Sequence, residues 1–436
     1  MTRTTKTRPG KAHAQSAVIA NTGTTELDKP VFAQPQPTPD PTTFEVKHPS
    51  DNPAYQQIDQ LNREHKINPL PFPQPRGVPE PRLTLASVLA ADDKLLQKKM
   101  TAGGQIVFHA TGDTGSTRGP ESQNLVADKM AADFSDDEAE RPMFFFHLGD
   151  VIYSFGEAQY YYDQFYEPYR GYPAPILALA GNHDGMVAPG TSASTLEAYL
   201  ENFCQTKFEV TSDAGGLSRT AQIQPGVFFT FEAPPYVRVL ALYSNTLEDP
   251  GVISDPTVGN SQLTYLKTAL QRVKSERFNG ALILAHHHPA YTAGSQHGWS
   301  REMLSQIDGI CNETGVWPHA VLSGHAHNYQ RLTRMHGDTQ IPYVVCGNGG
   351  HGLARLSRKK GVPLRTPQQL QTAGHADKVI LENYDDQDYG YLRVVATARQ
   401  LRIEYHPASD TDGAKTPDDF VTVDLATRKL VHFTGP

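Results

Sequence analysis

The sequence is poor in cysteine, in net positive charge and in long apolar runs. Three cysteines among 436 residues, Cys204, Cys311 and Cys346, do not make the disulfide framework of a small secreted domain, so we expect reduced thiols. Asp and Glu total 47 against 39 Lys and Arg, and the formal charge of -8 provides no general attraction to nucleic acid or to an anionic membrane. No stretch approaches the ~18 apolar residues that a membrane span needs. Neither nucleic acid nor a membrane is therefore an expected partner.

The N-terminus also lacks a recognisable targeting signal. Residues 1–23 are basic but contain no apolar core segment and no paired arginines. We therefore predict a cytoplasmic protein.

Proline is abundant near the N-terminus and breaks up regular structure there. It occupies every second position in two clusters, 35–41 and 69–75, a spacing that blocks both helices and sheet ladders. Residues 1–81 are predicted to form a largely disordered arm, in which Leu70 and Phe72 are placed to lie across the core surface. Residues 82–436 are predicted to form one folded domain, with mainly antiparallel strands from about residue 340.

Five short apolar runs stand out because each ends on side chains that bind metals. Each run has four to eight residues rich in Val, Ile, Leu and Phe, as in strands buried on both faces. The runs and their polar ends are QIVFHATGD (Asp113), MFFFHLGD (Asp150), PILALAGNHD (Asn182 to Asp184), ALILAHHHP (His286 to His288) and AVLSGHAH (His325 and His327). Ligands of layered α/β folds collect beyond the carboxyl ends of such strands, so the five runs predict one shared site.

Helical patterns alternate with these runs. Apolar residues recur at helical spacing in five segments, which we predict as helices: 82–100, 121–134, 157–168, 194–204 and 260–276. This alternation predicts a layered α/β fold.

The polar ends offer carboxylate, amide and imidazole groups but no thiolate. Such groups suit hard and borderline metal ions. A shared carboxylate can bridge two ions ~3.5 to 4 Å apart, the spacing at which two metals stabilise both the attacking and the leaving oxygen of a phosphoryl group. Two ions are therefore expected.

The motifs GDTG, GDVIY, GNHD, HHHP and GHAH, in this order, resemble those of the purple acid phosphatase type of metallophosphoesterase, within the calcineurin-like superfamily. The likeness covers about residues 105–331, and GHAHNYQR is similar to the family's GHxHxYER. It implies a four-layer αββα fold, two β-sheets packed as a sandwich and flanked by helices, with residues 82–436 as the catalytic domain.

Carried over by position, the resemblance assigns two sets of metal ligands. One ion would be held by Asp113, Asp150, Tyr153 and His327. The other would be held by Asp150, Asn182, His287 and His325. Asp150 is then the bridge, with trivalent iron at the Tyr153 site and iron, zinc or manganese as the second, divalent ion.

Tyr153 distinguishes the purple subgroup from its relatives. The wider group carries a histidine two residues after the first aspartate, where this chain has Gly115. The serine/threonine phosphatases of the superfamily need Asp and Arg where Tyr153 and Ala180 stand, which disfavours that branch. Aromatic packing among the neighbouring tyrosines is the alternative interpretation of Tyr153.

Three further histidine assignments follow from the resemblance. The family's ligand lies two residues before proline, which selects His287 and leaves His286 as the alternative. His183 and His297 match histidines that face substrate, and either one would protonate the leaving group. A surface position without function is the alternative for His297.

The reaction implied is hydrolysis of a small phosphate monoester by in-line attack of a metal-bound hydroxide, as in an acid phosphatase. A phosphodiesterase or nucleotide hydrolase with the same site is the first alternative, and a non-catalytic interaction protein with a proline-rich binding arm is the second. Arg118 and Arg331 are candidate substrate contacts, and the turn at 347–351 is interpreted as backbone geometry.

Overall fold

The computed structural model describes residues 56–432, apart from 59, 62–63, 65, 118, 136, 189, 295–296, 357–361, 372–374 and 410–415. Residues 1–55 of the arm predicted to be largely disordered lie outside this range. None of the helices in the part described has the length and apolar character that crossing a bilayer requires. Cys204, Cys311 and Cys346 are buried and unpaired, as predicted.

Two sheets of nine and seven strands form the centre of the fold. In spatial order, the larger sheet consists of β1 (Arg82–Thr84), β5 (Phe229–Ala233), β6 (Val237–Leu242), β7 (Ala281–His286), β8 (Ala320–Ser323), β10 (Thr339–Cys346), β9 (Tyr329–His336), β12 (Lys378–Asp385) and β11 (Gln368–Leu370). The smaller sheet consists of β16 (Lys429–Leu430), β15 (Asp419–Asp424), β14 (Gln400–Pro407), β13 (Gly390–Thr397), β2 (Gln105–Thr111), β3 (Phe145–His147) and β4 (Ile176–Ala178).

The two sheets pack face to face through a core of large apolar side chains. Phe144, beside β3, meets Phe231 of β5 edge-on, with ring centroids 4.8 Å apart. Phe146 lies on the same face, in one buried cluster with Ile283 and Leu322 of the larger sheet. This interface is the inside of a β-sandwich.

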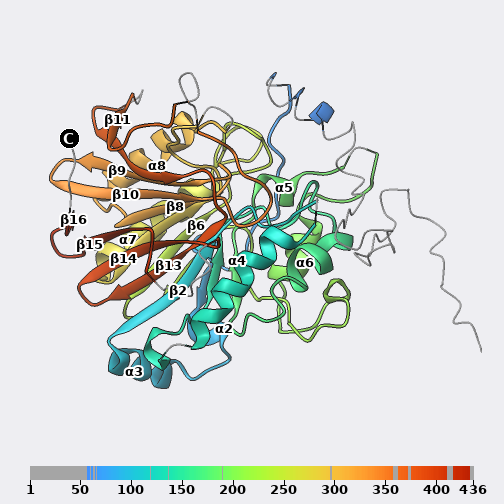
Figure 1. Ribbon diagram of the computed structural model, residues 1–436, viewed down its shortest axis with the longest axis horizontal. Coiled ribbons are helices and arrows are strands. Elements are labelled where there is room, and N and C mark those ends of the chain that lie inside the picture. Colours follow the sequence, from blue (N-terminus) through green and yellow to red (C-terminus); the bar gives the residue numbers. More distant parts are fainter. Residues whose placement is uncertain are drawn as a thin grey trace, which may run out of the picture.

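Helices surround the sandwich (Figure 1). They are α2 (Leu85–Val88), α3 (Asp93–Gly103), α4 (Glu121–Ala132), α5 (Asn182–Gly185), α6 (Glu197–Phe203), α7 (Ser261–Ser275) and α8 (Arg301–Thr314). A second buried cluster contains apolar residues of α4, α7 and α8, among them Val126, Leu266 and Ile307. The predicted two-sheet sandwich flanked by helices is confirmed.

The strands that precede the site are parallel within each sheet. In the smaller sheet β2, β3 and β4 are parallel neighbours, and in the larger sheet β6, β7 and β8 are. β13 pairs antiparallel with β2, so the C-terminal strands complete the sheet that carries the first two aspartates. The antiparallel pairing predicted for the C-terminal part is present in β9–β10 and in β13–β14–β15.

Two predicted helices differ from the structure. The segment after Pro81 begins with strand β1, whose Arg82 pairs with Glu232 on neighbouring β5, and only then becomes helical. The tyrosine-rich segment forms a short 3-10 turn followed by a π-helix, Tyr162–Tyr166. Within it, the Gln164 side chain binds the backbone N–H and C=O of Tyr153 at 2.9 and 3.0 Å, and such π-bulges are common next to functional sites.

The proline-rich segment before β1 lies across the core, as predicted. The ring of Phe72 meets Tyr243 edge-on, with centroids 5.4 Å apart. The Asn245 side chain binds both the N–H and the C=O of Leu70 at 2.8 Å. This contact joins the segment to the loop that follows β6.

Candidate metal centre

The polar ends of five strands from both sheets meet at one edge of the sandwich. Asp113 and Asp150 follow β2 and β3, and Asn182 begins the short helix after β4. His287 follows β7 of the larger sheet, and His325 and His327 follow β8, so each sheet contributes to the cluster. Parallel strands end at the same edge, which explains why residues far apart in sequence meet there.

The phenol of Tyr153 lies at the centre of the first predicted ligand group. Its hydroxyl is 3.1 Å from Asp113 Oδ1, 3.0 Å from Asp150 Oδ2 and 3.2 Å from His327 Nε2. His327 Nε2 is in turn 3.4 Å from Asp113 Oδ1. The four side chains that the resemblance assigned to one ion therefore lie together.

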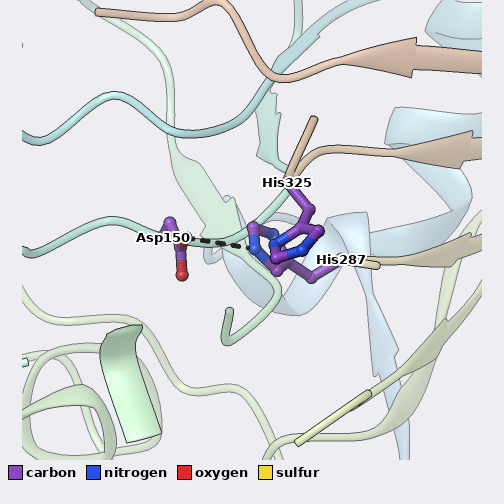
Figure 2. Close-up of side chains that lie close together, drawn as sticks. All are labelled: Asp150, His287 and His325. Atoms are coloured by element: carbon purple, nitrogen blue, oxygen red, sulfur yellow. Dashed lines mark ion pairs between the residues drawn. The ribbon is translucent and has the colours of Figure 1, made fainter. Parts of the chain in front are cut away.

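The second predicted group lies around the amide of Asn182. Asn182 Oδ1 is 3.1 Å from both His287 Nε2 and His325 Nδ1. His287 Nε2 is also 3.2 Å from Asp150 Oδ2. Figure 2 shows the Asp150 carboxylate facing the His287 ring, with the His325 ring beside it. Asp150 thus belongs to both groups.

The three consecutive histidines at the end of β7 point to different partners. His287 Nδ1 donates to the Leu148 carbonyl at 2.8 Å, which leaves Nε2 directed at the cluster. His286 Nδ1 donates to the His288 carbonyl at 2.6 Å, and burial lowers the pKa of His286 to about 4. His288 Nε2 donates to the Leu247 carbonyl at 2.6 Å. Only His287 of the three faces the two aspartates.

The backbone is strained at three residues of the cluster. Asp113, Asp150 and His325 have φ values of 57°, 54° and 67°, in the left-handed region that residues other than glycine rarely adopt. A Cβ at Gly181 would overlap the Asp150 carboxylate, so the GNH motif needs glycine for this close approach. Strain of this kind persists where the surrounding structure enforces it, and it clusters at active and ligand-binding sites.

The cluster concentrates negative charge away from water. Burial alone would lower the pKa of His287, but the carboxylates of Asp150 and Asp113 outweigh burial and raise it to about 10. Burial, helped by the charge of Asp150, raises the pKa of Asp184 to about 7. Carboxylates, an amide oxygen and imidazole nitrogens converge here, and such groups bind cations. A bound cation would neutralise the negative charge of the buried carboxylates, which a protonated His287 would otherwise have to neutralise.

His183 and His297, predicted to face substrate, both lie beside the cluster. His183 Nδ1 donates to the Ser154 carbonyl at 2.8 Å, and its Nε2 is 3.6 Å from Glu248 Oε1. The His297 ring lies 4.8 Å from both His325 and His327, measured between centroids. The structure therefore brings all nine predicted site residues together.

Two arginines, Arg118 and Arg331, were predicted to contact substrate. Arg331 is paired with Asp419 at 2.7 Å and with Glu382 at 3.2 Å, on β9. Its guanidinium is therefore committed to a structural ion pair, and the prediction that it contacts substrate is wrong. Arg118 lies outside the described residues.

Several residues of the site had no role in the sequence prediction. Asp184 accepts hydrogen bonds from the N–H groups of Val151 and Gly181, at 3.0 and 2.8 Å, and holds the Asp150 loop against the Asn182 loop. The position of Asp184 in the GNHD motif was the sequence feature that could have indicated this role. His351, in the turn interpreted as backbone geometry, stacks on Tyr153 with centroids 3.5 Å apart. No sequence pattern indicates that contact.

Comparisons with known proteins agree with this geometry. The family model of the calcineurin-like phosphoesterases matches residues 106–329, just over half of the chain. Purple acid phosphatase 23 of Arabidopsis thaliana is 24% identical over 193 residues, which make up 43% of this chain and 36% of the plant protein. The structure of purple acid phosphatase PPD1 from yellow lupin (Lupinus luteus) seeds is similar with a TM-score of 0.50 at 18% identity, over 73% of this chain and 54% of that one. The chain thus spans less than two thirds of either relative, and the structural likeness concerns the fold.

Proposed function

Because the chain belongs to the calcineurin-like phosphoesterase family, we propose that it is a two-metal hydrolase that cleaves small phosphate monoesters, as purple acid phosphatases do. The observation that carries the proposal is the convergence of two ligand groups on Asp150, which contacts both Tyr153 and His287. A carboxylate shared in this way can bridge two cations.

Two ions would be held by the groups already described. Asp113, Asp150, Tyr153 and His327 would hold one ion, and Asp150, Asn182, His287 and His325 the other. Two carboxylates and a phenol suit trivalent iron, whereas the amide and imidazoles suit divalent iron, zinc or manganese. When bound, the two ions supply Lewis acidity and a lowered water pKa.

The protein's own groups would prepare the site for these ions. The Leu148 carbonyl holds the proton of His287 on Nδ1 and so presents a lone pair at Nε2. Asp184 and Gln164 hold the backbone of the loop that carries Asp150 and Tyr153. The left-handed backbone at Asp113 and Asp150 would direct both carboxylates into the cluster, with Asp150 where the two groups meet.

His183 and His297 are proposed to handle the leaving group. His183 keeps its Nδ1 proton on the Ser154 carbonyl and points Nε2 toward Glu248. His297 lies beside His325 and His327. In this proposal, either ring would donate a proton to the departing oxygen of the ester.

Metal analysis combined with visible absorption tests the proposal. The purified wild type is expected to contain two metal ions, with iron at one site and a visible band from charge transfer between phenolate and iron. Tyr153→Phe is expected to lose that band. A colourless, iron-free wild type with full activity would assign the chain to another subgroup of the family.

Paired assays with an aryl phosphate monoester and the matching diester test the substrate class. The monoester is expected to give the higher kcat/KM. A preference for the diester would contradict the monoester assignment while leaving the two-metal site intact.

A further inference from the structure

The two ring nitrogens of His325 face different partners. Nδ1 is 3.1 Å from Asn182 Oδ1, on the side of the proposed second ion. Nε2 is 3.6 Å from Asp249 Oδ1, and this buried nitrogen has no hydrogen-bond partner among the described residues. An imidazole that offers a lone pair at Nδ1 carries its proton on Nε2, and a buried N–H needs an acceptor.

The two carboxylate oxygens of Asp249 also face different partners. Its Oδ2 accepts a hydrogen bond from the N–H of Gly298 at 2.9 Å, next to His297. Its Oδ1 is buried and, within the described part of the chain, has no hydrogen bond of its own. An acceptor without a partner therefore faces a donor without a partner.

The loop that carries Asp249 is anchored on both sides of it. Before Asp249, the buried His288 donates from Nε2 to the Leu247 carbonyl at 2.6 Å. After it, the Ser300 hydroxyl donates to the Gly251 carbonyl at 2.6 Å. These bonds hold the backbone on both sides of Asp249, and the bond from Gly298 N–H holds its side chain, as a supporting residue of a metal site must be held.

We propose that Asp249 is a positioning residue that accepts a hydrogen bond from His325 Nε2 and thereby directs His325 Nδ1 toward the second metal ion. The inference rests on the proposed two-metal function. Carboxylate–histidine–metal arrangements fix the tautomer and the ring orientation of the ligand, and their loss typically weakens metal binding about 10- to 100-fold.

A third cation is the competing explanation for the same groups. Glu248, His297 and His325 each offer one ligand atom, and these atoms lie within 4.8 Å of one another. His325 can serve both ions only by giving up its last N–H proton, because each nitrogen would need a free lone pair. The two explanations predict different metal stoichiometries.

Calorimetric titration of the metal-stripped full-length chain with Zn²⁺ distinguishes the positioning role of Asp249 from a third cation site. Wild type is expected to bind two ions, and Asp249→Ala to bind one of the two about 10- to 100-fold more weakly. Asp249→Asn has one amide oxygen, which can accept from either Gly298 N–H or His325 Nε2–H but not from both, so its affinity is expected to fall between those of wild type and Asp249→Ala. The thermal unfolding transition of Asp249→Ala shows whether this variant folds. If it does not fold, the Zn²⁺ affinity of Asp249→Asn is compared with that of wild type instead.

Glu248→Gln is the matched control, because it changes the neighbouring acid, which faces His183, and leaves Asp249 in place. It is expected to bind two Zn²⁺ ions with affinities within about threefold of wild type. Unchanged affinity in both Asp249 variants would overturn the proposal, and so would three ions in wild type with one lost in Glu248→Gln. Wild type that binds no Zn²⁺ would instead refute the two-metal function itself, and this inference with it.

Discussion

The two ligand groups that meet at Asp150 differ in the chemistry they offer a cation. The Tyr153 group contributes a second carboxylate and a phenol, and its centre is one hydroxyl within 3.2 Å of three other groups. The Asn182 group contributes an amide oxygen and two imidazoles, whose nitrogens both lie 3.1 Å from that oxygen. Hard anionic oxygens favour a trivalent ion, whereas imidazole favours a divalent one. Under the proposed two-metal function, one shared carboxylate would therefore join two sites with different metal preferences.

Asp150→Asn removes the feature that the two groups share, so its expected effect is the largest. Both sites lose a negative ligand, and we expect kcat/KM to fall by roughly 10³-fold or more, about 4 kcal/mol of transition-state stabilisation. Elemental analysis should find fewer than two ions per chain. Two retained ions with activity near wild type would contradict the bridging role.

His287→Ala breaks only the Asn182 group. We expect one ion to be lost, the Tyr153 band to be kept, and activity to fall by about 10²-fold. His286→Ala is the matched control, because this neighbour is equally buried but donates to the His288 carbonyl, away from the aspartates. The control should lower thermal stability while it retains both ions; loss of an ion from the control alone would reverse the assignment.

His351→Ala disturbs only the surroundings of the Tyr153 group, and its expected effect is the smallest. The stacked ring contributes about 0.5–1.5 kcal/mol as an aromatic pair, so we expect a loss of activity of about tenfold at most. Both ions should remain bound, and the visible band should shift because the phenol loses its stacking partner. An unchanged spectrum would show that the ring does not influence Tyr153.

The prediction of the site from sequence depends on where apolar runs end. Asp113, Asp150 and His325 each follow a buried strand, and strands that end at a common edge bring such residues into one cluster. The π-helix at Tyr162–Tyr166 is not predictable from local pattern, because it depends on Gln164 binding the Tyr153 backbone. The prediction of a helix at β1 is wrong because the short apolar pattern there fits a helix as well as a strand.

The sequence by itself determined which polar side chains end the buried strands, because the pattern of apolar residues along the chain indicates which segments are buried strands and where they end. The two sheets, and the choice of His287 over His286, were already implied by the family resemblance, and the structure shows both. Only the tertiary structure decided that His351 stacks on Tyr153 and that Asp249 lies beside His325. Those contacts join segments far apart in the chain. Local periodicity specifies which residues are buried, but the packing of the sandwich specifies what each one meets.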